Sequence, residues 1–124
     1  MSTQAYRGNS IAVILPCFNE APAIARVVGD FRAAFPEAAI YVFDNDSTDG
    51  TADAARRAGA EVIAVSTRGK GNVVRRMFAD VEADIYVMAD GDGTYDATAG
   101  RKLVDALVDG HLDMVVGTRV SKGT

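Results

Sequence analysis

Short apolar runs alternate along this chain with segments whose apolar residues recur at helical spacing. The runs are rich in β-branched residues and are bounded by polar or glycine-containing stretches, which is typical of buried strands. Five such runs are present, and they span Ile11 to Leu15, Ala39 to Phe43, Glu61 to Val65, Asp84 to Met88 and Leu112 to Val116. We expect each of them to be a buried strand.

The segments between these runs predict four helices. The first has its apolar side chains three and four residues apart on one face, and Pro22 lies near its start, where a missing N–H costs nothing. The second begins with Thr48 or Asp49 as a cap and runs through Ala58, where Gly59 ends it. The inward residues of the first helix are Ile24, Val27, Val28, Phe31 and Phe35.

The third and fourth helices are predicted from the same periodicity. The third runs from about Asn72 to Val81, and the fourth from about Ala97 to Asp109, with Gly110 as its stop. The expected inward residues are Val74, Met77, Phe78 and Val81 in the third helix and Leu103, Val104, Leu107 and Val108 in the fourth.

Strand and helix thus alternate four times before a final strand. This order predicts an α/β fold, a three-layer α/β/α sandwich with a mostly parallel central sheet of the Rossmann-like kind. In such folds ligands bind beyond the carboxyl ends of the strands, where the strand order reverses. The loops at that edge carry nearly all of the polar and glycine-rich segments, namely residues 16–20, 44–51, 68–71 and 90–92.

Composition sets limits on this picture. The 124 residues are 48% hydrophobic and 24% charged, which suits one globular domain, and the net charge of −4 argues against a sequence-independent nucleic-acid binder. We expect residues 1–9 to be a flexible leader and residues 10–124 to be the domain. No signal peptide or run of about 20 apolar residues is present, so we expect a cytoplasmic protein. The lone Cys17 fits a reducing compartment, and we expect it to be a buried small side chain.

Asp90 and Asp92 are the candidate metal ligands. They lie two residues apart directly after the fourth apolar run, and Mg²⁺ and Mn²⁺ favour carboxylate oxygens while keeping positions open for substrate phosphates. Gly91 and Gly93 allow close backbone approach, and the Thr94 hydroxyl is within reach of the same ion. The alternative is an ordinary polar turn, since Asp and Gly are common turn formers.

The other loops at this edge offer groups for an organic anion. Asp44 can accept hydrogen bonds from a base N–H or a ribose hydroxyl, or it can form an Asx turn or cap. Arg68 and Lys70 suit a diphosphate, with a solvated basic turn as the alternative. Glu20 can bind ligand or favour the start of the first helix through its dipole. We assign Asp46, Ser47 and Asp49 to the turn, with Ser47 and Asp49 serving the first N–H groups of the second helix.

Taken together, these motifs resemble those of the family 2 glycosyltransferases, which have a GT-A fold, and most closely the polyprenyl- and dolichyl-phosphate sugar synthases. The segment from Pro16 to Glu20 is similar to the Pro-x-x-Asn-Glu opening of that family. Residues 44–51 match its Asp-Asn-Gly-Ser-Thr-Asp-Gly-Thr signature except at Asp46. Residues 68–71 resemble its glycine-basic loop, residues 90–92 its metal-binding Asp-x-Asp, and residues 115–119 the strand that follows.

The resemblance implies a nucleotide-sugar-binding half. Pro16, Phe18, Glu20 and Asp44 would surround base and ribose, with Lys70 also in the nucleotide-sugar site. Asp90 and Asp92 would approach the ribose and a Mg²⁺ or Mn²⁺ ion on the diphosphate of a nucleotide-diphosphate sugar. The implied reaction is direct displacement with inversion, in which Asp92 acts through the metal. A polyprenyl phosphate acceptor, already anionic, needs no strong general base.

Three departures from the family pattern qualify this prediction. Asp46 replaces a glycine, and Thr94 stands where the polyprenyl-phosphate enzymes often have Gln. The chain also ends soon after its fifth strand, whereas the family continues into an acceptor-binding half. We therefore expect a truncated donor-binding domain whose base and acceptor residues are absent, peripheral contact with the cytoplasmic face of a membrane, and self-association through the truncation edge.

Two other functions fit parts of the sequence. A non-catalytic nucleotide-binding protein would keep the same fold without transferring sugar. A haloacid-dehalogenase-like phosphatase would use residues 90–94 as its Asp-x-Asp-x-Thr loop, with Asp90 as nucleophile. That loop normally follows the first strand, and only Lys102 and Lys122 follow it here, without a convincing acidic pair.

Overall fold

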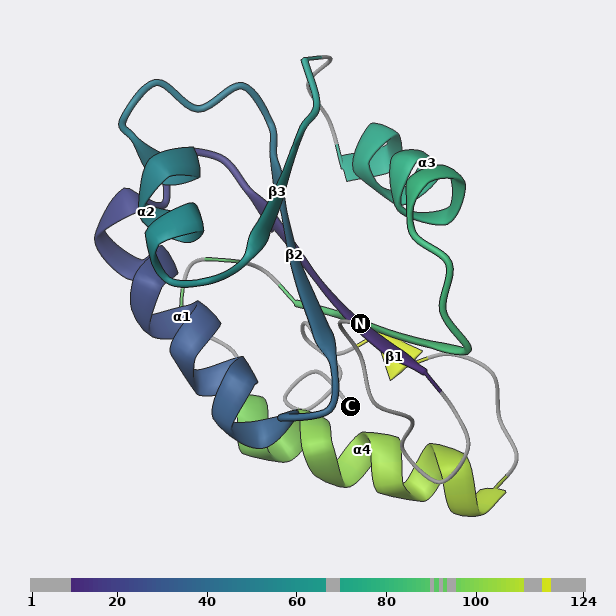
Figure 1. The fold of residues 1–124 in the computed structure, drawn as a ribbon. Helices are drawn as coiled ribbons and strands as arrows, with labels where there is room; N and C mark the ends of the chain where they lie inside the picture. The colour runs from purple at the N-terminus through teal and green to yellow at the C-terminus, as the bar shows by residue number, and fades with distance from the viewer. Residues whose placement is uncertain are drawn as a thin grey trace.

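The computed structural model describes residues 10–66, 70–89, 91, 93, 96–110 and 115–116. For residues 70–74, 103, 106–110 and 115–116 it describes the backbone only. Strands and helices alternate through this part of the chain (Figure 1). They are β1 (Ile11–Cys17), α1 (Ala21–Ala34), β2 (Ala39–Asp44), α2 (Thr51–Arg57), β3 (Glu61–Ala64), α3 (Lys70–Asp80), β4 (Ile85–Met88), α4 (Ala97–Gly110) and β5 (Val115–Val116).

The strands form one sheet in the order β3-β2-β1-β4-β5, and every pairing between them is parallel. The predicted parallel sheet is therefore confirmed. The chain adds β2 and β3 on one side of β1 and then crosses to add β4 and β5 on the other. The strand order consequently reverses between β1 and β4, and their carboxyl ends are where this architecture binds ligands.

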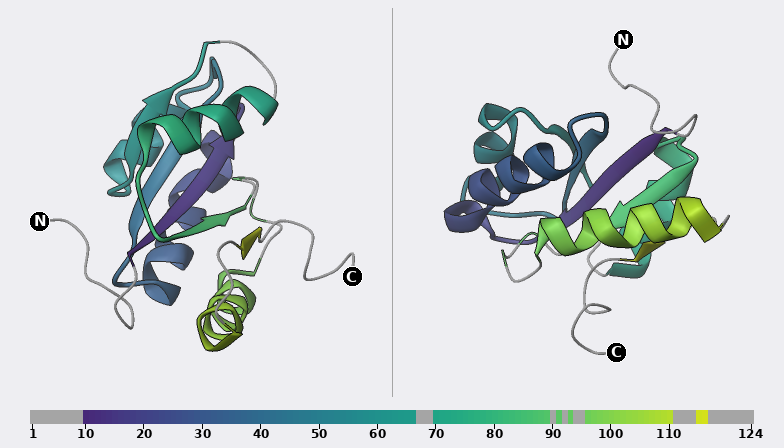
Figure 2. Two further views of the ribbon diagram at one scale, coloured as in Figure 1. Left: turned by 90° about the vertical axis from the view of Figure 1, so that its right-hand side faces the viewer. Right: turned by 90° about the horizontal axis from the view of Figure 1, so that it is seen from below.

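The helices cover the two faces of the sheet unequally. In Figure 1, α1 and α2 lie on one side of the strands with α4 below them, whereas α3 lies on the other side; Figure 2 shows the same layers from two further directions. The larger apolar core lies beneath α1, α2 and α4, and a smaller core that includes Met77 and Val81 lies beneath α3. The predicted three-layer sandwich is thus confirmed.

Helix α1 follows its sequence pattern closely. Pro22 lies in its first turn, where no intrahelical N–H bond is lost. The predicted inward residues Ile24, Val27, Val28, Phe31 and Phe35 are all buried, and Phe35 is the C-cap residue. The stripe packs α1 into the larger core together with residues of β1, β2 and β4.

Two expectations about packing are wrong. β3 is an edge strand rather than a buried one, and its Glu61 and Ala64 are exposed. Phe78 was expected to point inward, but it is 50% exposed and makes an edge-on contact with Tyr86, at 5.1 Å between ring centroids. Met77 of α3 and Val81, which directly follows α3, are four residues apart and both buried, and Phe78 lies about 100° around the helix from Met77.

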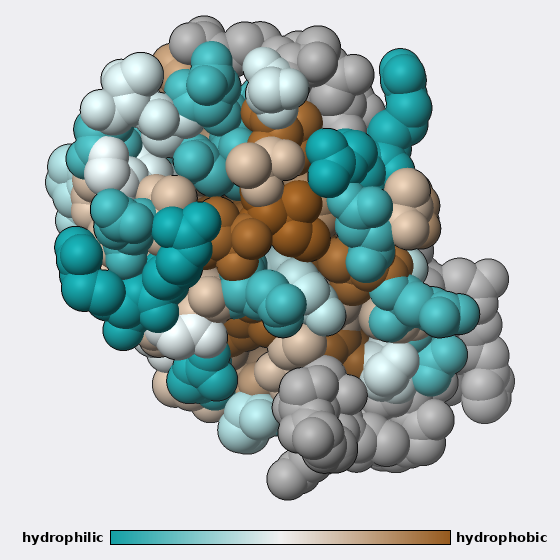
Figure 3. Space-filling view, turned by 45° about the horizontal axis from the view of Figure 1, so that its top comes forward, coloured by the Kyte–Doolittle hydropathy of each residue, from teal (hydrophilic) through white to brown (hydrophobic). Residues whose placement is uncertain are grey.

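Of the predicted inward residues of α4, Val104 is fully buried. Leu103, Leu107, Val108 and the side chain of Val74 lie outside the described side chains. Figure 3, which turns the carboxyl edge of the sheet partly toward the viewer, shows apolar side chains in the middle of this face with hydrophilic ones around them. No helix in the described residues is long and apolar enough to cross a membrane.

Candidate functional site

The loops that follow β1 and β2 lie against each other at the carboxyl edge. The two strands are paired in register up to Cys17 and Asp44, and the next backbone N–H, that of Asn45, donates to the Cys17 carbonyl at 2.8 Å. The Asn45 side chain, which is buried, donates to the Val65 carbonyl at 2.9 Å and so ties in the end of β3. The ends of three neighbouring strands are therefore joined at this edge.

Asn19 and Ser47 join the two loops through a reciprocal pair of hydrogen bonds. The Asn19 backbone N–H donates to Ser47 Oγ at 2.8 Å, and the Thr48 backbone N–H donates to Asn19 Oδ1 at 2.8 Å. Asn19 has a left-handed φ of 54°, a conformation that Asn tolerates better than most residues. Ser47 therefore serves the loop after β1 and not the second helix, contrary to expectation.

Asp49 holds the starts of α1 and α2 together. Its Oδ2 accepts the Ala21 N–H of α1 at 3.1 Å, and its Oδ1 accepts the Thr51 N–H of α2 at 3.1 Å. The Thr51 hydroxyl, which is fully buried, donates to the same carboxylate and accepts the Glu20 N–H at 2.9 Å. One carboxylate thus lies at the amino ends of two helices, where their dipoles favour negative charge.

This arrangement corrects the predicted cap of α2. The N-cap residue is Gly50, with a left-handed φ of 87°, rather than Thr48 or Asp49. Gly59, with a φ of 101°, follows the C-cap residue as predicted. The hydrogen bond from the Thr51 hydroxyl is the largest cause that lowers the pKa of the Asp49 carboxyl below its ordinary value of 3.8, and the N–H of Ala21 acts in the same direction.

The two carboxylate oxygens of Asp44, at the carboxyl edge of the sheet, differ in their hydrogen bonds. The residue is 8% exposed, and its Oδ1 accepts the Ser47 N–H at 3.2 Å, which is the Asx-type contact weighed from the sequence. Among the described residues, no hydrogen bond to its Oδ2 is found. That oxygen is the atom with which Asp44 can accept a hydrogen bond from a ligand.

Of the remaining predicted site residues, the structure describes some completely, one by its backbone only and others not at all. Pro16 is buried in β1, Phe18 is 39% exposed just beyond it, and Glu20 is the N-cap of α1 without a side-chain cap bond. Lys70 begins α3, but its side chain lies outside the described residues. Asp90, Asp92, Arg68 and Thr94 also lie outside them, so the predicted metal ligands are not described directly.

The two glycines that flank Asp92 are described, and both are closely packed. The Gly91 N–H donates to the Pro16 carbonyl at 3.3 Å. A Cβ at Gly91 would overlap Cys17 Sγ, and a Cβ at Gly93 would overlap Arg26 Nη2. The neighbour at Gly91 is a buried cysteine of β1, whereas the neighbour at Gly93 is the end of an exposed arginine side chain.

Asp46 stands at the one signature position where the sequence departs from the family pattern. Its φ is 67°, in the left-handed region that glycine adopts without cost. The turn shape is therefore kept at this position, and the exposed Asp46 side chain adds a negative charge beside Asp44.

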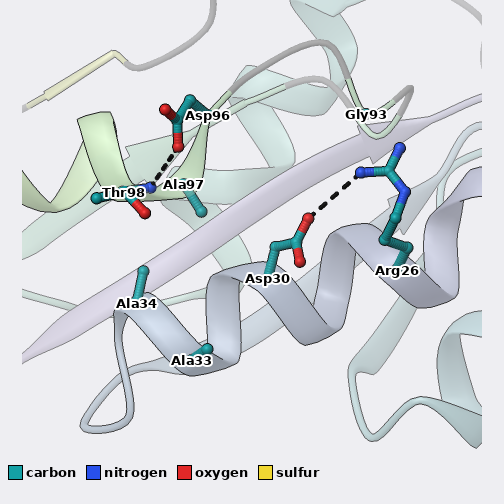
Figure 4. Close-up of a pocket in the computed structure, with 8 residues that line it drawn as sticks. All are labelled: Arg26, Asp30, Ala33, Ala34, Gly93, Asp96, Ala97 and Thr98. Carbon is teal, nitrogen blue, oxygen red and sulfur yellow. Dashed lines mark hydrogen bonds and ion pairs between the residues drawn. The ribbon is translucent and has the colours of Figure 1, made fainter.

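A separate cavity of about 560 Å³ lies between α1 and the start of α4 (Figure 4). Its lining includes Gly93 of the loop after β4, and among the described residues it contains none of those predicted to bind the nucleotide. The described lining residues are Arg26, Asp30, Ala33, Ala34, Gly93, Asp96, Ala97 and Thr98.

Three residues that shape the site are not among those predicted from the sequence. Asn19 and Thr51 accept backbone N–H groups from the neighbouring loop, and Arg26 packs on Gly93. The signal for Asn19 and Thr51 was their small polar side chains within the two motifs. Nothing in the local pattern around Arg26 distinguishes it from an exposed helix residue.

A family model described as "Glycosyl transferase family 2" matches residues 12–124. The chain belongs to this family. Protein RfbJ of Shigella flexneri is 57% identical over 118 residues, which are 95% of this chain and 92% of RfbJ. The dolichyl-phosphate hexose transferase of Haloferax volcanii is 32% identical over 118 residues, which are 95% of this chain but 51% of that relative. The glycosyltransferase assignment and the resemblance on which it rested are confirmed.

The fold is shared with a protein of known structure. Glucosyl-3-phosphoglycerate synthase of Mycobacterium tuberculosis, in complex with Mn²⁺ and UDP-glucose, matches with a TM-score of 0.67 and 30% sequence identity. The match covers 86% of this chain and 40% of that one. This chain therefore spans less than half of the synthase, and it carries the part with the GT-A α/β fold.

Proposed function

We propose that this chain is the nucleotide-sugar-binding part of a metal-dependent, inverting glycosyltransferase. The observation that carries the proposal is the joining of the loops after β1 and β2 at the carboxyl edge of the sheet, beside the point between β1 and β4 where the strand order reverses. That is the edge at which this architecture binds ligands. Mn²⁺ and UDP-glucose in the related synthase support a nucleoside diphosphate and a divalent ion as the ligands.

We assign the residues of this site as follows. Phe18, on the exposed side of the β1 loop, contacts the base, with Pro16 and Glu20 on either side of it along the chain. The Oδ2 atom of Asp44 accepts a hydrogen bond from the nucleoside. Lys70 neutralises charge on the diphosphate, and Asp90 and Asp92 hold Mg²⁺ or Mn²⁺.

The chemistry follows from these assignments. A bound divalent metal supplies stabilisation of the negative charge that develops on the leaving nucleoside diphosphate. The protein orients the donor through Asp44 and the β1 loop, so that the anomeric carbon is open to attack from the opposite side. A polyprenyl phosphate attacks through an oxygen that is already anionic, so no side chain of this chain has to remove a proton.

The first test is metal-dependent nucleotide binding. We expect UDP to bind in isothermal titration calorimetry with MnCl₂ and to bind at least tenfold more weakly with EDTA. Asp92→Ala abolishes the metal-dependent part and leaves the fold intact, since loop residues at a strand end carry function more than packing. Asp53→Ala removes an exposed carboxylate from α2 and serves as the matched control. Equal binding of UDP by the Asp92→Ala variant and by the wild type would exclude the site.

The acceptor is a separate part of the proposal. The relative named dolichyl-phosphate hexose transferase supports a polyprenyl phosphate, and peripheral contact with a membrane would follow from such a lipid. Transfer of radiolabelled sugar from a nucleotide-sugar panel to a short polyprenyl phosphate tests it. Binding of UDP and Mn²⁺ without any transfer would favour the non-catalytic alternative. Family membership argues against the phosphatase. Self-association stays a prediction that light scattering can check.

A further inference from the structure

The start of α1 lies where an architecture of this kind can bind a phosphate group. In dinucleotide-binding folds the pyrophosphate lies at the amino end of the helix that follows the first strand, against backbone N–H groups that have no partner within the helix. Helix α1 follows β1 and begins at the carboxyl edge, beside the reversal of strand order between β1 and β4. A donor diphosphate can bind there only where these N–H groups are free.

The N–H groups at the start of α1 are already bonded within the protein. Those of residues 19–21 donate to side-chain oxygens of the loop after β2 and the first residue of α2. The acceptors are, in order, Ser47 Oγ at 2.8 Å, Thr51 Oγ1 at 2.9 Å and Asp49 Oδ2 at 3.1 Å. Pro22 has no N–H, and the next two residues donate to the Glu20 carbonyl at 3.0 and 2.9 Å. Each backbone N–H of the described segment 19–24 is therefore used.

The Asp49 carboxylate stands at this helix start as an anion would. Three donors converge on it, because the Ala21 N–H bonds to Oδ2 while the N–H and the hydroxyl of Thr51 bond to Oδ1. Thr51 is fully buried, whereas Asp49 is exposed, so fixed donors face a position that is open to solvent. The hydroxyl bond is the largest cause that lowers the pKa of Asp49, which keeps the carboxylate charged at neutral pH. Figure 1 shows α1 and α2 beside each other.

We propose that Asp49 is a specificity-determining residue, an internal anion that closes the start of α1 to the phosphates of the nucleotide sugar. Its negative charge repels a phosphate, and it already occupies the donors that a phosphate would need. The first strand–helix unit then binds the nucleoside alone, and the diphosphate is left to the metal and Lys70. This inference rests on the proposed function, because it takes a nucleotide sugar as the ligand.

Removal of the carboxylate should open the position to an anion from solution. Asp49→Ala leaves the Ala21 N–H and the Thr51 donors without their acceptor. Formate can replace the missing carboxylate, and inorganic phosphate represents the group of the sugar donor. Asp49→Asn removes the charge but keeps the position filled by an amide, so it should admit neither anion. Asp53→Ala removes an exposed carboxylate from the first turn of α2 and is the matched control for the lost charge.

The experiment is thermal denaturation of the wild type and the three variants without metal or nucleotide. Sodium formate and sodium phosphate are each compared with sodium chloride at equal ionic strength. We expect both anions to raise the midpoint temperature of Asp49→Ala by about 4 °C more than that of the wild type. This excess should be below about 1 °C in Asp49→Asn and Asp53→Ala. If Asp49→Ala is unfolded in chloride, formate and phosphate should restore its far-ultraviolet circular dichroism.

Several outcomes would overturn the role of Asp49. These are equal shifts in Asp49→Ala and the wild type, no recovery of an unfolded Asp49→Ala, or an equal excess in Asp49→Asn, which would show an effect of charge rather than of a vacated position. An effect of formate without one of phosphate would overturn the exclusion of phosphate. Failed rescue together with normal binding of UDP and Mn²⁺ by the wild type would overturn this inference alone. Failure of the wild type to bind UDP with Mn²⁺ would overturn the proposed function, and with it the role of Asp49 in donor specificity.

Discussion

The two loop systems at the carboxyl edge are held by different physical means. The loops after β1 and β2 are joined by hydrogen bonds between side chains and backbone, in which Asn19, Ser47, Asp49 and Thr51 take part. In the loop after β4 the described residues Gly91 and Gly93 have no room for a Cβ. Polar side chains therefore shape the backbone in the first system, whereas at Gly91 and Gly93 the close neighbours require a residue without a side chain.

This difference changes how the motif residues are interpreted. A polar residue in a ligand-binding loop is not necessarily a ligand-binding residue, because buried backbone N–H groups also need acceptors. Asp49 and Thr51 satisfy N–H groups at the starts of α1 and α2. Of the carboxylates after β2, Asp44 is therefore the best placed to bind a ligand.

The largest expected effect is on the packed loop. Gly91→Ala introduces a Cβ that overlaps Cys17 Sγ and lies 3.3 Å from Ile24 Cδ1, in a buried position. We expect a loss of about 3 kcal/mol in the free energy of unfolding, measured by urea denaturation. Gly29→Ala is the control, because nothing lies within 4 Å of its added Cβ, and it should stabilise α1 by about 1 kcal/mol.

A double-mutant cycle sharpens that result. If the clash with sulfur is the cause, Cys17→Ala should make Gly91→Ala much less costly than in the wild-type background. Additive effects of the two substitutions on the free energy of unfolding would show that the overlap with the Cys17 sulfur does not cause the loss of stability.

The second prediction concerns the hydrogen-bonded loops. Thr51→Val keeps the shape of a fully buried side chain but leaves the Glu20 N–H without its acceptor. We expect a loss of about 2 kcal/mol in the free energy of unfolding. Thr48→Val changes an exposed threonine in the same loop and should cost less than about 0.5 kcal/mol. Equal effects of the two variants would contradict the role given to Thr51.

The third prediction is a dependence of stability on pH that only the hydrogen-bonded loops should show. Because the folded state lowers the pKa of Asp49, its carboxylate stabilises the fold fully above the ordinary value of 3.8. That contribution is lost as the pH falls through the lower pKa of the folded state. Asp49→Asn should therefore be less stable than the wild type near neutral pH, and the difference should shrink in acid. A constant difference at every pH would refute this.

The smallest expected effect is at Asp46. Asp46→Gly relieves a left-handed backbone conformation but increases the freedom of the unfolded chain, so we expect a net stabilisation below about 0.5 kcal/mol. Asp46→Ala keeps the conformational cost and should destabilise the fold by about 1 kcal/mol. Thermal denaturation of both variants would check the sign, and stabilisation by alanine would show that the turn does not require a positive φ.

Most of the fold could be predicted from the sequence because periodicity and burial agree along most elements. The stripe from Ile24 to Phe35 placed α1, and β1, β2 and β4 lie where the apolar runs predicted them. The apolar pattern predicted burial wrongly where burial depends on how many helices cover a face of the sheet. Phe78 belongs to a helical stripe in the sequence, yet α3 is the only described helix on its face of the sheet, so a residue at the margin of that stripe stays exposed.

For the candidate site, too, one part could be predicted from the sequence and another could not. The amino-acid sequence is enough to predict which chemical groups collect at the carboxyl ends of the strands, because parallel strands joined by helices bring all of those loops to one edge. How these groups are used depends on contacts between residues far apart in the chain, which are seen in the folded structure alone. Asp49 became a link between two helices, and Arg26 became the neighbour of Gly93. No local pattern encodes such contacts, because they form only when the strands and helices pack.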